Sequence, residues 1–300
     1  MKPAPFTYHA PDTLAEALGL LAELGHEAKI LAGGQSLIPL LNMRLAAPAH
    51  LVDINHLTEL ARTEVDAEGV RVGALVRHAE LEHHAEAGQT LPLLRRALLQ
   101  VAHPVIRNRG TTVGSIAHAD PAAEMPAVLA VLDGEVELVS AGSSRTVSAA
   151  DFFVGPLESC ARAGELVRAV RFRRPRPASG LVGTAFVELA RRHGDYALAG
   201  LATVVTLDAD QRVVGAHAAY LGVAGVPLRL DLTEALRPVA AAAATPEDFL
   251  AAGQLARVSV EPEADIHASV EYRRHLVAVL TTRALAAAAR DAVPTPREAA

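Results

Sequence analysis

The stretch "ILAGGQSLIPLLN", residues 30–42, turns from an apolar strand into an apolar helix through Gly33, Gly34, Gln35 and Ser36. Glycine costs backbone entropy on folding, so two in a row indicate a left-handed backbone or a close approach by another group. A helix start without an obstructing Cβ also favours anions, because its N–H groups and the helix dipole attract negative charge. An ordinary tight turn before a helix is the alternative interpretation of this corner.

The segments around this corner predict a βαβ-like unit. A capping box from Thr13 to Glu16 begins a helix of apolar residues at helical spacing, and Gly25 is expected to end it. Strands are expected over 28–32 and 50–54, with Pro39 tolerated in the first turn of the helix between them.

Mixed α/β patterning continues to about residue 172. We expect further strands over 69–76 and 165–172, helices over 78–88 and 91–102, and a hairpin formed by "EVELVS" and "RTVSAADF". The stretch "RFRRPRPASG", residues 171–180, has the composition of an exposed connection between domains, with an anion site as the alternative.

A second, α+β domain is expected after this connection. Residues 198–225 predict two long strands around a turn near Asp208 to Gln211. Alanine-rich helices should follow at about 247–258 and 266–290.

The composition sets aside several classes of protein. A chain of 300 residues that is 51% hydrophobic favours two domains with sizeable cores. A net charge of −6 and 3% aromatic residues argue against a nucleic-acid binder. The apolar runs are too short to span a membrane and the N-terminus lacks a signal region, so we expect a soluble, cytoplasmic protein.

Cysteine and histidine usage argues against a metal centre in this chain. Cys160 is the single cysteine, which excludes an internal disulfide and a cluster needing several thiolates. The histidines of "HAELEHHAEAG" lack the HExxH spacing, so a solvated helix surface is favoured over metal binding.

A second glycine corner lies in "HPVIRNRGTTVGSIAHADPAAEMPAVLAVL", residues 103–132. Two such corners, at 33–36 and 110–115, suggest a pyrophosphate held from two sides. Hydroxyl donors would come from Ser36, Thr111 and Ser115. Neither corner is a Walker A loop, and the absence of GxGxxG makes a Rossmann-type nicotinamide dehydrogenase the weakest interpretation.

Two long motifs then carry a family resemblance. "AGGQSLIPLLNMRLAAPAHLVDI" and "RNRGTTVGSIAHADPAAEMPAVLAVLDGEVEL" resemble the FAD-binding medium subunit of molybdenum hydroxylases, the carbon monoxide dehydrogenase and xanthine dehydrogenase family. The likeness extends through "GPLESCARAGELVRAVRF" and "RRHGDYALAG". It implies an α+β chain: a type-2 (PCMH-like) FAD-binding domain of two α/β subdomains at 1–176, a smaller α+β C-terminal domain of the carbon monoxide dehydrogenase flavoprotein type at 177–290, and a frayed tail at 291–300.

The resemblance also implies a set of FAD-binding residues. The first pyrophosphate loop corresponds to Ala32, Gly33, Gly34, Gln35 and Ser36, and the second to Thr111, Thr112, Val113, Gly114 and Ser115. Sugar and ribityl contacts are implied for Asp120 and Glu124, and flavin-ring contacts for Leu166, Val167, Arg192 and Tyr196, with Asp195 nearby.

Some of these assignments have alternatives. Val113 stands where relatives carry glycine, so the second loop must keep an ordinary backbone there. Asp120 suits a turn cap before Pro121 equally well, and both roles are compatible. Tyr196 could be a core residue, and Arg192 could belong to a solvated pair with Arg191.

By this resemblance the chain is an oxidoreductase subunit that takes electrons from 2Fe–2S clusters of a partner and passes them from FAD to an external acceptor. The implied partners are a small 2Fe–2S subunit and a large molybdopterin subunit, in a dimer of heterotrimers. No catalytic residue or metal ligand is assigned to this chain. A stand-alone FAD-dependent oxidoreductase of the type-2 superfamily and a noncatalytic docking subunit with a decayed flavin site are the alternatives.

Overall fold

The computed structural model describes residues 2–177 and 179–293 and divides into two compact units that interleave along the sequence. Unit 1 comprises Met1–Leu91, Ala102–Asp120 and Asp133–Arg173, and unit 2 comprises Pro92–Val101, Pro121–Leu132 and Arg174–Ala300. Two short pieces of the first half of the sequence therefore pack with the second half. The boundary between 176 and 177 stays a prediction, and residues 294–300 of the predicted tail lie outside the described residues.

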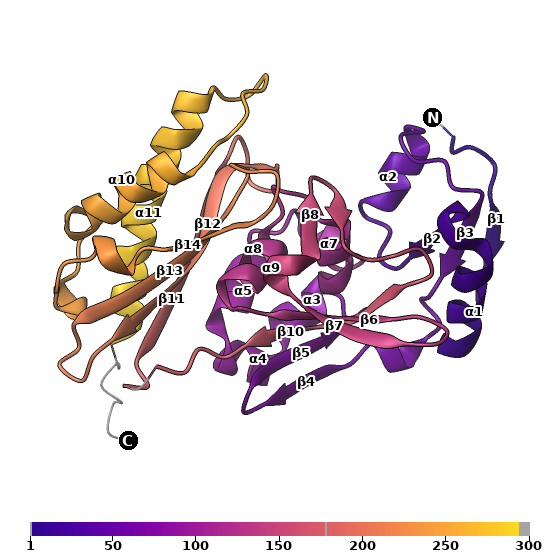
Figure 1. Cartoon of the computed structure of the whole chain (residues 1–300), viewed down its shortest axis with the longest axis horizontal. Helices are drawn as coiled ribbons and strands as arrows, with labels where there is room; N and C mark the ends of the chain where they lie inside the picture. The colour runs from indigo at the N-terminus through magenta and orange to yellow at the C-terminus, as the bar shows by residue number, and fades with distance from the viewer. Residues whose placement is uncertain (1, 178, 294–300) are drawn as a thin grey trace. The chain divides into compact units, whose positions relative to one another are not determined.

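The βαβ-like unit is confirmed in unit 1 (Figure 1). Its sheet has the order β1-β3-β2, with both pairings parallel. Its elements are β1 (Thr7–His9), α1 (Leu14–Leu24), β2 (Ala28–Leu31), α2 (Leu37–Asn42) and β3 (His50–Asp53). Thr13 caps α1 by accepting from the N–H of Glu16 at 3.2 Å, and Gly25 follows its last residue, as expected. The other half of the predicted capping box differs, because the Glu16 side chain accepts from the N–H of Asp12 at 2.9 Å.

A second sheet of unit 1 is antiparallel, with the order β4-β5-β10-β6-β7. Its strands are β4 (Thr63–Asp66), β5 (Gly69–Gly73), β6 (Glu135–Val139), β7 (Ser144–Ser148) and β10 (Leu166–Arg173). The expected hairpin is thus the β6–β7 pair. Inward residues such as Val72, Val136 and Phe172 are fully buried, so this sheet carries one core face.

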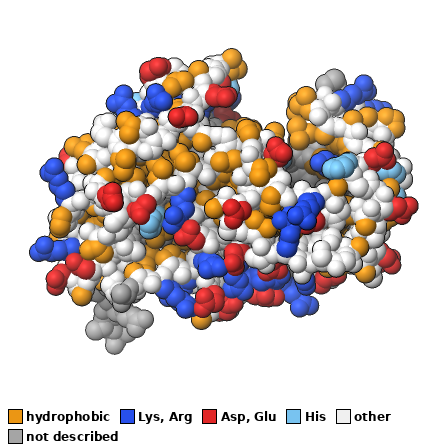
Figure 2. Space-filling view, in the orientation of Figure 1, with side chains coloured by type: hydrophobic (Ala, Val, Ile, Leu, Met, Phe, Trp, Pro, Cys, Tyr) orange, Lys and Arg blue, Asp and Glu red, His pale blue; other side chains and the backbone are white. Residues whose placement is uncertain are grey.

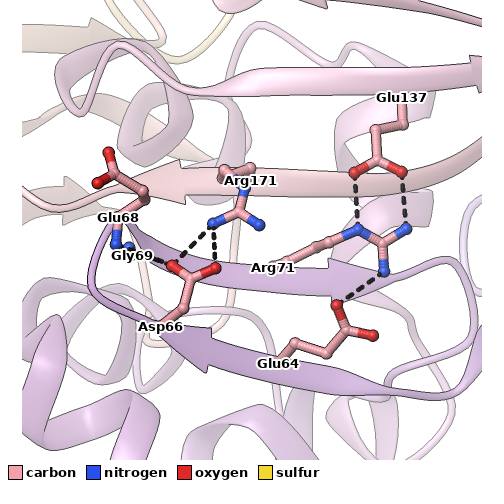
Figure 3. A network of polar contacts seen from close by, with 7 residues as sticks. All are labelled: Glu64, Asp66, Glu68, Gly69, Arg71, Glu137 and Arg171. Atoms are coloured by element: carbon pink, nitrogen blue, oxygen red, sulfur yellow. Dashed lines mark hydrogen bonds and ion pairs between the residues drawn. The ribbon is translucent and has the colours of Figure 1, made fainter.

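The other face of this sheet is charged. Arg71 on β5 makes two hydrogen bonds of 2.6 Å to Glu137 and one of 3.4 Å to Glu64, and Arg171 on β10 pairs with Asp66 at 2.9 Å (Figure 3). The Arg71 guanidinium holds the pKa of Glu137 below its ordinary value. In the space-filling view, acidic and basic side chains mix where Figure 1 draws β4 and β5 (Figure 2). Alternating charge of this kind belongs to a solvated sheet face.

Short helices and a small hairpin complete unit 1. They are η1 (Gly25–Glu27), η2 (Thr58–Leu60), α3 (His78–His83), α4 (Ala85–Thr90), α6 (Pro104–Arg107), α7 (Thr112–His118), α9 (Ala149–Phe152), β8 (Phe153–Gly155) and β9 (Glu158–Ser159). The single helix expected over 78–88 is wrong. His84 has an extended backbone and caps α4 through its ring nitrogen, so the chain restarts its helix there.

Unit 2 is built on the antiparallel sheet β11-β12-β13-β14. Its elements are α5 (Pro92–Leu98), α8 (Glu124–Val131), β11 (Val182–Ala190), β12 (Ala197–Leu207), β13 (Val213–Leu221), β14 (Leu228–Asp231), η3 (Thr233–Ala235), η4 (Ala241–Ala243), η5 (Pro246–Phe249), α10 (Leu250–Ser259) and α11 (Val270–Asp291). The two long strands and the two C-terminal helices are as expected, while the helix expected over 91–102 is shorter.

The sheet of unit 2 is covered on both faces. Figure 1 draws α10 and α11 on one side of it and α5 and α8 on the other. Nearly every residue of the central strand β12 is buried, which requires packing on both faces. Residues Met125 to Val131 of α8 are all buried, so this helix has no solvent face.

The α+β fold of two subdomains followed by a further α+β domain is confirmed. Among the described residues, no helix is both long and apolar enough to cross a membrane.

Candidate functional site at two glycine corners

The structure brings the two glycine corners into direct contact. A Cβ on Gly33 would lie 2.5 Å from the carbonyl oxygen of Arg109, 2.7 Å from the Cα of Gly110 and 2.9 Å from the N of Thr111. Real Cβ atoms do not approach other atoms so closely, so only glycine fits. The group that a side chain at Gly33 would obstruct is therefore the backbone of the second corner.

Gly34 is a glycine for a different reason. Its φ of +71° is left-handed, which L side chains rarely adopt. The turn is held by two hydrogen bonds, from the N–H of Ile38 to the oxygen of Gly34 at 3.0 Å and from Nε2 of Gln35 to the oxygen of Gly33 at 3.1 Å. Each of the two expected causes, a left-handed backbone and a close approach, thus applies to one glycine of the pair.

The first corner offers unused backbone donors. Among the described residues, the N–H groups of Gly33, Gly34, Gln35 and Ser36 have no hydrogen-bond partner in the protein. Ser36 sits at the N-cap of α2, but its hydroxyl makes no capping bond. All four residues are half-buried, so these donors are available to water or to an anion.

In the second corner, most backbone N–H groups already donate to acceptors within the protein. The N–H groups of Gly110, Thr112 and Ser115 donate to Ile106, Val76 and Thr111, and that of Gly114 donates to Oγ1 of Thr111 at 3.0 Å. Thr111 is thereby the side-chain cap of α7.

The departure at Val113 does not disturb this corner. Val113 is the second residue of α7, so its backbone is helical, as expected. Its side chain is buried, with 2% of its surface exposed. Valine here packs into the core on an ordinary helical backbone.

Two residues that sequence reasoning missed connect the corners. The side chain of Asn55 donates from Nδ2 to the oxygen of Ala32 at 2.9 Å and accepts at Oδ1 from Arg77 at 2.6 Å. Arg77 also donates to the oxygen of Arg109 at 2.8 Å. No spacing motif marks either residue, because each bond joins segments 22 to 32 residues apart.

A buried polar cluster lies beneath the second corner. His78 is almost fully buried, and its ring Nδ1 lies 3.2 Å from Oγ1 of Thr112. The backbone N–H of His78 donates to the carbonyl oxygen of Gly110 at 2.9 Å. Arg107 donates to Glu82 at 2.8 Å in a buried ion pair. Burial, aided by the positive charge of Arg107, lowers the pKa of His78 to about 4, so the imidazole is neutral at pH 7.

The remaining predicted residues of unit 1 lie farther along the chain. Asp120 follows Ala119, whose left-handed φ of 55° ends α7, and the oxygen of Ala119 accepts from the N–H of Leu157 at 3.0 Å. Leu166 and Val167 begin β10 with buried side chains, ahead of a bulge in its pairing with β6. Buried side chains leave only their backbone to meet a ligand.

Glu124, Arg192 and Tyr196 belong to unit 2. Glu124 begins α8, and its charge adds to burial in raising the pKa of Glu188 to about 8. Arg192 is exposed and pairs with Asp195 at 3.4 Å. Tyr196 is 71% exposed, so the alternative that it is a core residue is wrong.

Models of two protein families match this chain. The family described as the FAD binding domain in molybdopterin dehydrogenase matches residues 4–175, and the CO dehydrogenase flavoprotein C-terminal domain matches residues 184–288.

Relatives match over almost the whole chain. The 6-hydroxypseudooxynicotine dehydrogenase complex subunit alpha of Paenarthrobacter nicotinovorans is 40% identical, with 98% of each chain covered. The carbon monoxide dehydrogenase medium chain of Afipia carboxidovorans is 35% identical, covering 95% of this chain and 97% of its own. Among solved structures, carbon monoxide dehydrogenase from Hydrogenophaga pseudoflava has a TM-score of 0.90 at 34% identity, covering 98% of this chain and 100% of that one.

Proposed function

This chain belongs to the family of FAD-binding medium subunits of molybdenum hydroxylases, and from that premise we propose that it binds one FAD noncovalently within a heteromeric oxidoreductase. The observation that supports this most directly is the contact between the two glycine corners, one of which has open N–H donors. A diphosphate needs donors from closely spaced main chain without a Cβ in the way. The residues present fit that group.

The first corner would supply most of the main-chain donors. Its N–H groups at 33–36 are unused, and the hydroxyl of Ser36 is free of a capping role. The second corner would contribute the hydroxyl of Ser115 and the surface against which the first corner is held. Sugar and ring contacts are proposed for Asp120, Glu124, Leu166, Val167, Arg192 and Tyr196.

When bound here, FAD would supply electron transfer between the 2Fe–2S clusters of a small subunit and an external acceptor, in a complex whose large subunit carries a molybdopterin centre. The task of this chain is to bind and orient the flavin and to set its surroundings. We propose an assembly as a dimer of heterotrimers in the cytoplasm. Its substrate is chosen by the large subunit.

Co-expression of the chain with its neighbouring subunits tests the proposal. We expect the purified complex to show flavin absorbance and to release FAD when denatured. A folded complex without flavin would contradict the proposal and favour a docking subunit with a decayed site. Substrate turnover by the isolated chain would instead favour a stand-alone oxidoreductase.

A further inference from the structure

Arg77 and Asn55 tie the two glycine corners together without belonging to either. We propose that they are positioning residues, which fix the backbone of the two corners in the arrangement that accepts the diphosphate of the cofactor. This inference rests on the proposed function and adds the residues on which its binding site depends. We call the pair the Arg77–Asn55 bridge.

Asn55 fixes the peptide between Ala32 and Gly33. Its Nδ2 donates to the oxygen of Ala32. The C=O and N–H of a trans peptide point in opposite directions, so holding the oxygen of Ala32 directs the N–H of Gly33 to the other side. That N–H is one of the unused donors of the first corner.

The Asn55 side chain is itself held in one orientation. Oδ1 of Asp53 accepts from the backbone N–H of Asn55 at 2.9 Å and from Nδ2 at 2.6 Å. Tyr8 donates to the other oxygen of Asp53 at 2.7 Å. The amide group therefore presents its nitrogen to Ala32 and its oxygen to Arg77.

Arg77 carries the connection to the second corner. A planar guanidinium can hold two acceptors at fixed separation, and this one holds the oxygen of Arg109 and Oδ1 of Asn55. Gly110 and Thr111 follow Arg109 directly, and the backbone of Arg77 also pairs with that of Thr111 in an isolated antiparallel β-bridge. Because the guanidinium of Arg77 donates to the carbonyl of Arg109 and to the side chain of Asn55, Arg77 acts on a diphosphate through the loops.

The charged sheet face provides a matched control. Arg171 is also a partly buried arginine of unit 1 with a close polar partner, but among the described residues its hydrogen bonds and ion pair go to Asp66, across the sheet from β10 to β4 (Figure 3). Loss of Arg171 removes an arginine of the same kind without touching either corner.

The test measures binding of FAD, and of ADP as a flavin-free diphosphate probe, to the full-length chain after removal of flavin. Arg77→Gln, Asn55→Ala, the double variant and Arg171→Gln are compared by calorimetry at a temperature where circular dichroism shows all of them folded. We expect each bridge variant to bind both ligands at least about tenfold more weakly than wild type. Arg171→Gln should bind as wild type does.

The double variant decides whether the two residues act as one unit. If they do, it binds no more than about twofold more weakly than the weaker single variant, because either substitution already breaks the bridge. Wild-type affinity in both single variants, or a loss for FAD without a loss for ADP, would overturn the inference. Failure of the wild-type protein to bind FAD would overturn the proposed function instead, so the two failures are distinguishable.

Discussion

The two glycine corners differ in how their polar groups are used, although they lie against each other. The first corner has unused N–H groups at 33–36, whereas the second donates from Gly110, Thr112, Gly114 and Ser115 within the protein. In the first corner, glycine serves a left-handed turn and a close approach. In the second, Gly114 makes room for the threonine that caps α7. This difference supports the proposal that the first corner binds the diphosphate while the second supports it.

Substitution of Gly33 should have the largest effect on this pair of corners. A Cβ there would meet the backbone of Arg109, Gly110 and Thr111, which cannot move aside as a side chain can. We expect Gly33→Ala to lower the free energy of unfolding by about 1–3 kcal/mol, and Gly33→Val to prevent folding of the corner. Flavin binding would be lost with it. Urea unfolding measures the effect, and Gly142→Ala, with open space around it, is the control. A Gly33→Ala protein as stable as wild type would show that the contact is loose.

Low pH should lower the free energy of unfolding through His78, which lies beneath the second corner. The folded pKa of His78 is about 4, below its ordinary value of 6.5. Between pH 6.5 and about 4, His78 is protonated in the unfolded chain but neutral in the folded chain. The contribution of His78 to stability is therefore present in full above pH 6.5 and is lost as the pH falls through about 4. We expect the loss to approach about 3 kcal/mol.

Unfolding midpoints between these two pH values provide the measurement. His78→Gln, which cannot be protonated there, should have a flatter profile over the same range. Equal slopes for wild type and variant would show that His78 does not carry this dependence.

A double-mutant cycle at the cap of α7 should give a smaller effect. A Cβ on Gly114 would lie 2.5 Å from Oγ1 of Thr111, so Gly114→Ala breaks the cap that Thr111→Ala removes. We expect either change alone to cost about 1 kcal/mol. In the Thr111→Ala background, Gly114→Ala should instead stabilise by up to about 1 kcal/mol, because alanine favours the helix. Additive effects in thermal unfolding would contradict this.

The smallest effect on stability is expected at Ser36. Its hydroxyl caps nothing, so Ser36→Ala should leave the unfolding midpoint unchanged. One lost hydrogen bond to a charged group should weaken FAD binding by roughly tenfold. Ser144→Ala, at an exposed position on β7, is the control for flavin titrations. A stability loss without an affinity loss would reverse the roles assigned to the two corners.

Local signals in the sequence were sufficient for the corners. Paired glycines, the strand before them and the helix after them all lie within 28–42, and the structure has each of them. The β6–β7 hairpin and the β12–β13 pair were predictable for the same reason, since each joins neighbouring segments.

Long-range partners could not be predicted in this way. No pattern in the sequence around Asn55 and Arg77 predicts that they donate to the carbonyls of Ala32 and Arg109. Those carbonyls lie far away in the sequence and come close only in the fold. The sequence of α8 is apolar at nearly every position, but nothing in it indicates that the helix packs against β12 and β13 in unit 2. The break at His84 depends on a single side-chain cap, which outweighs a continuous helical pattern.

The burial of α8 has a consequence for synthesis of the chain. The apolar residues of α8, among them Met125 and Leu129, leave the ribosome well before β12 and β13 do, although these strands cover them within unit 2. During synthesis the sides of this apolar segment that β12 and β13 cover in the folded protein therefore stay exposed to solvent until about residue 221 has emerged. A fragment ending at residue 176 would retain this exposure permanently.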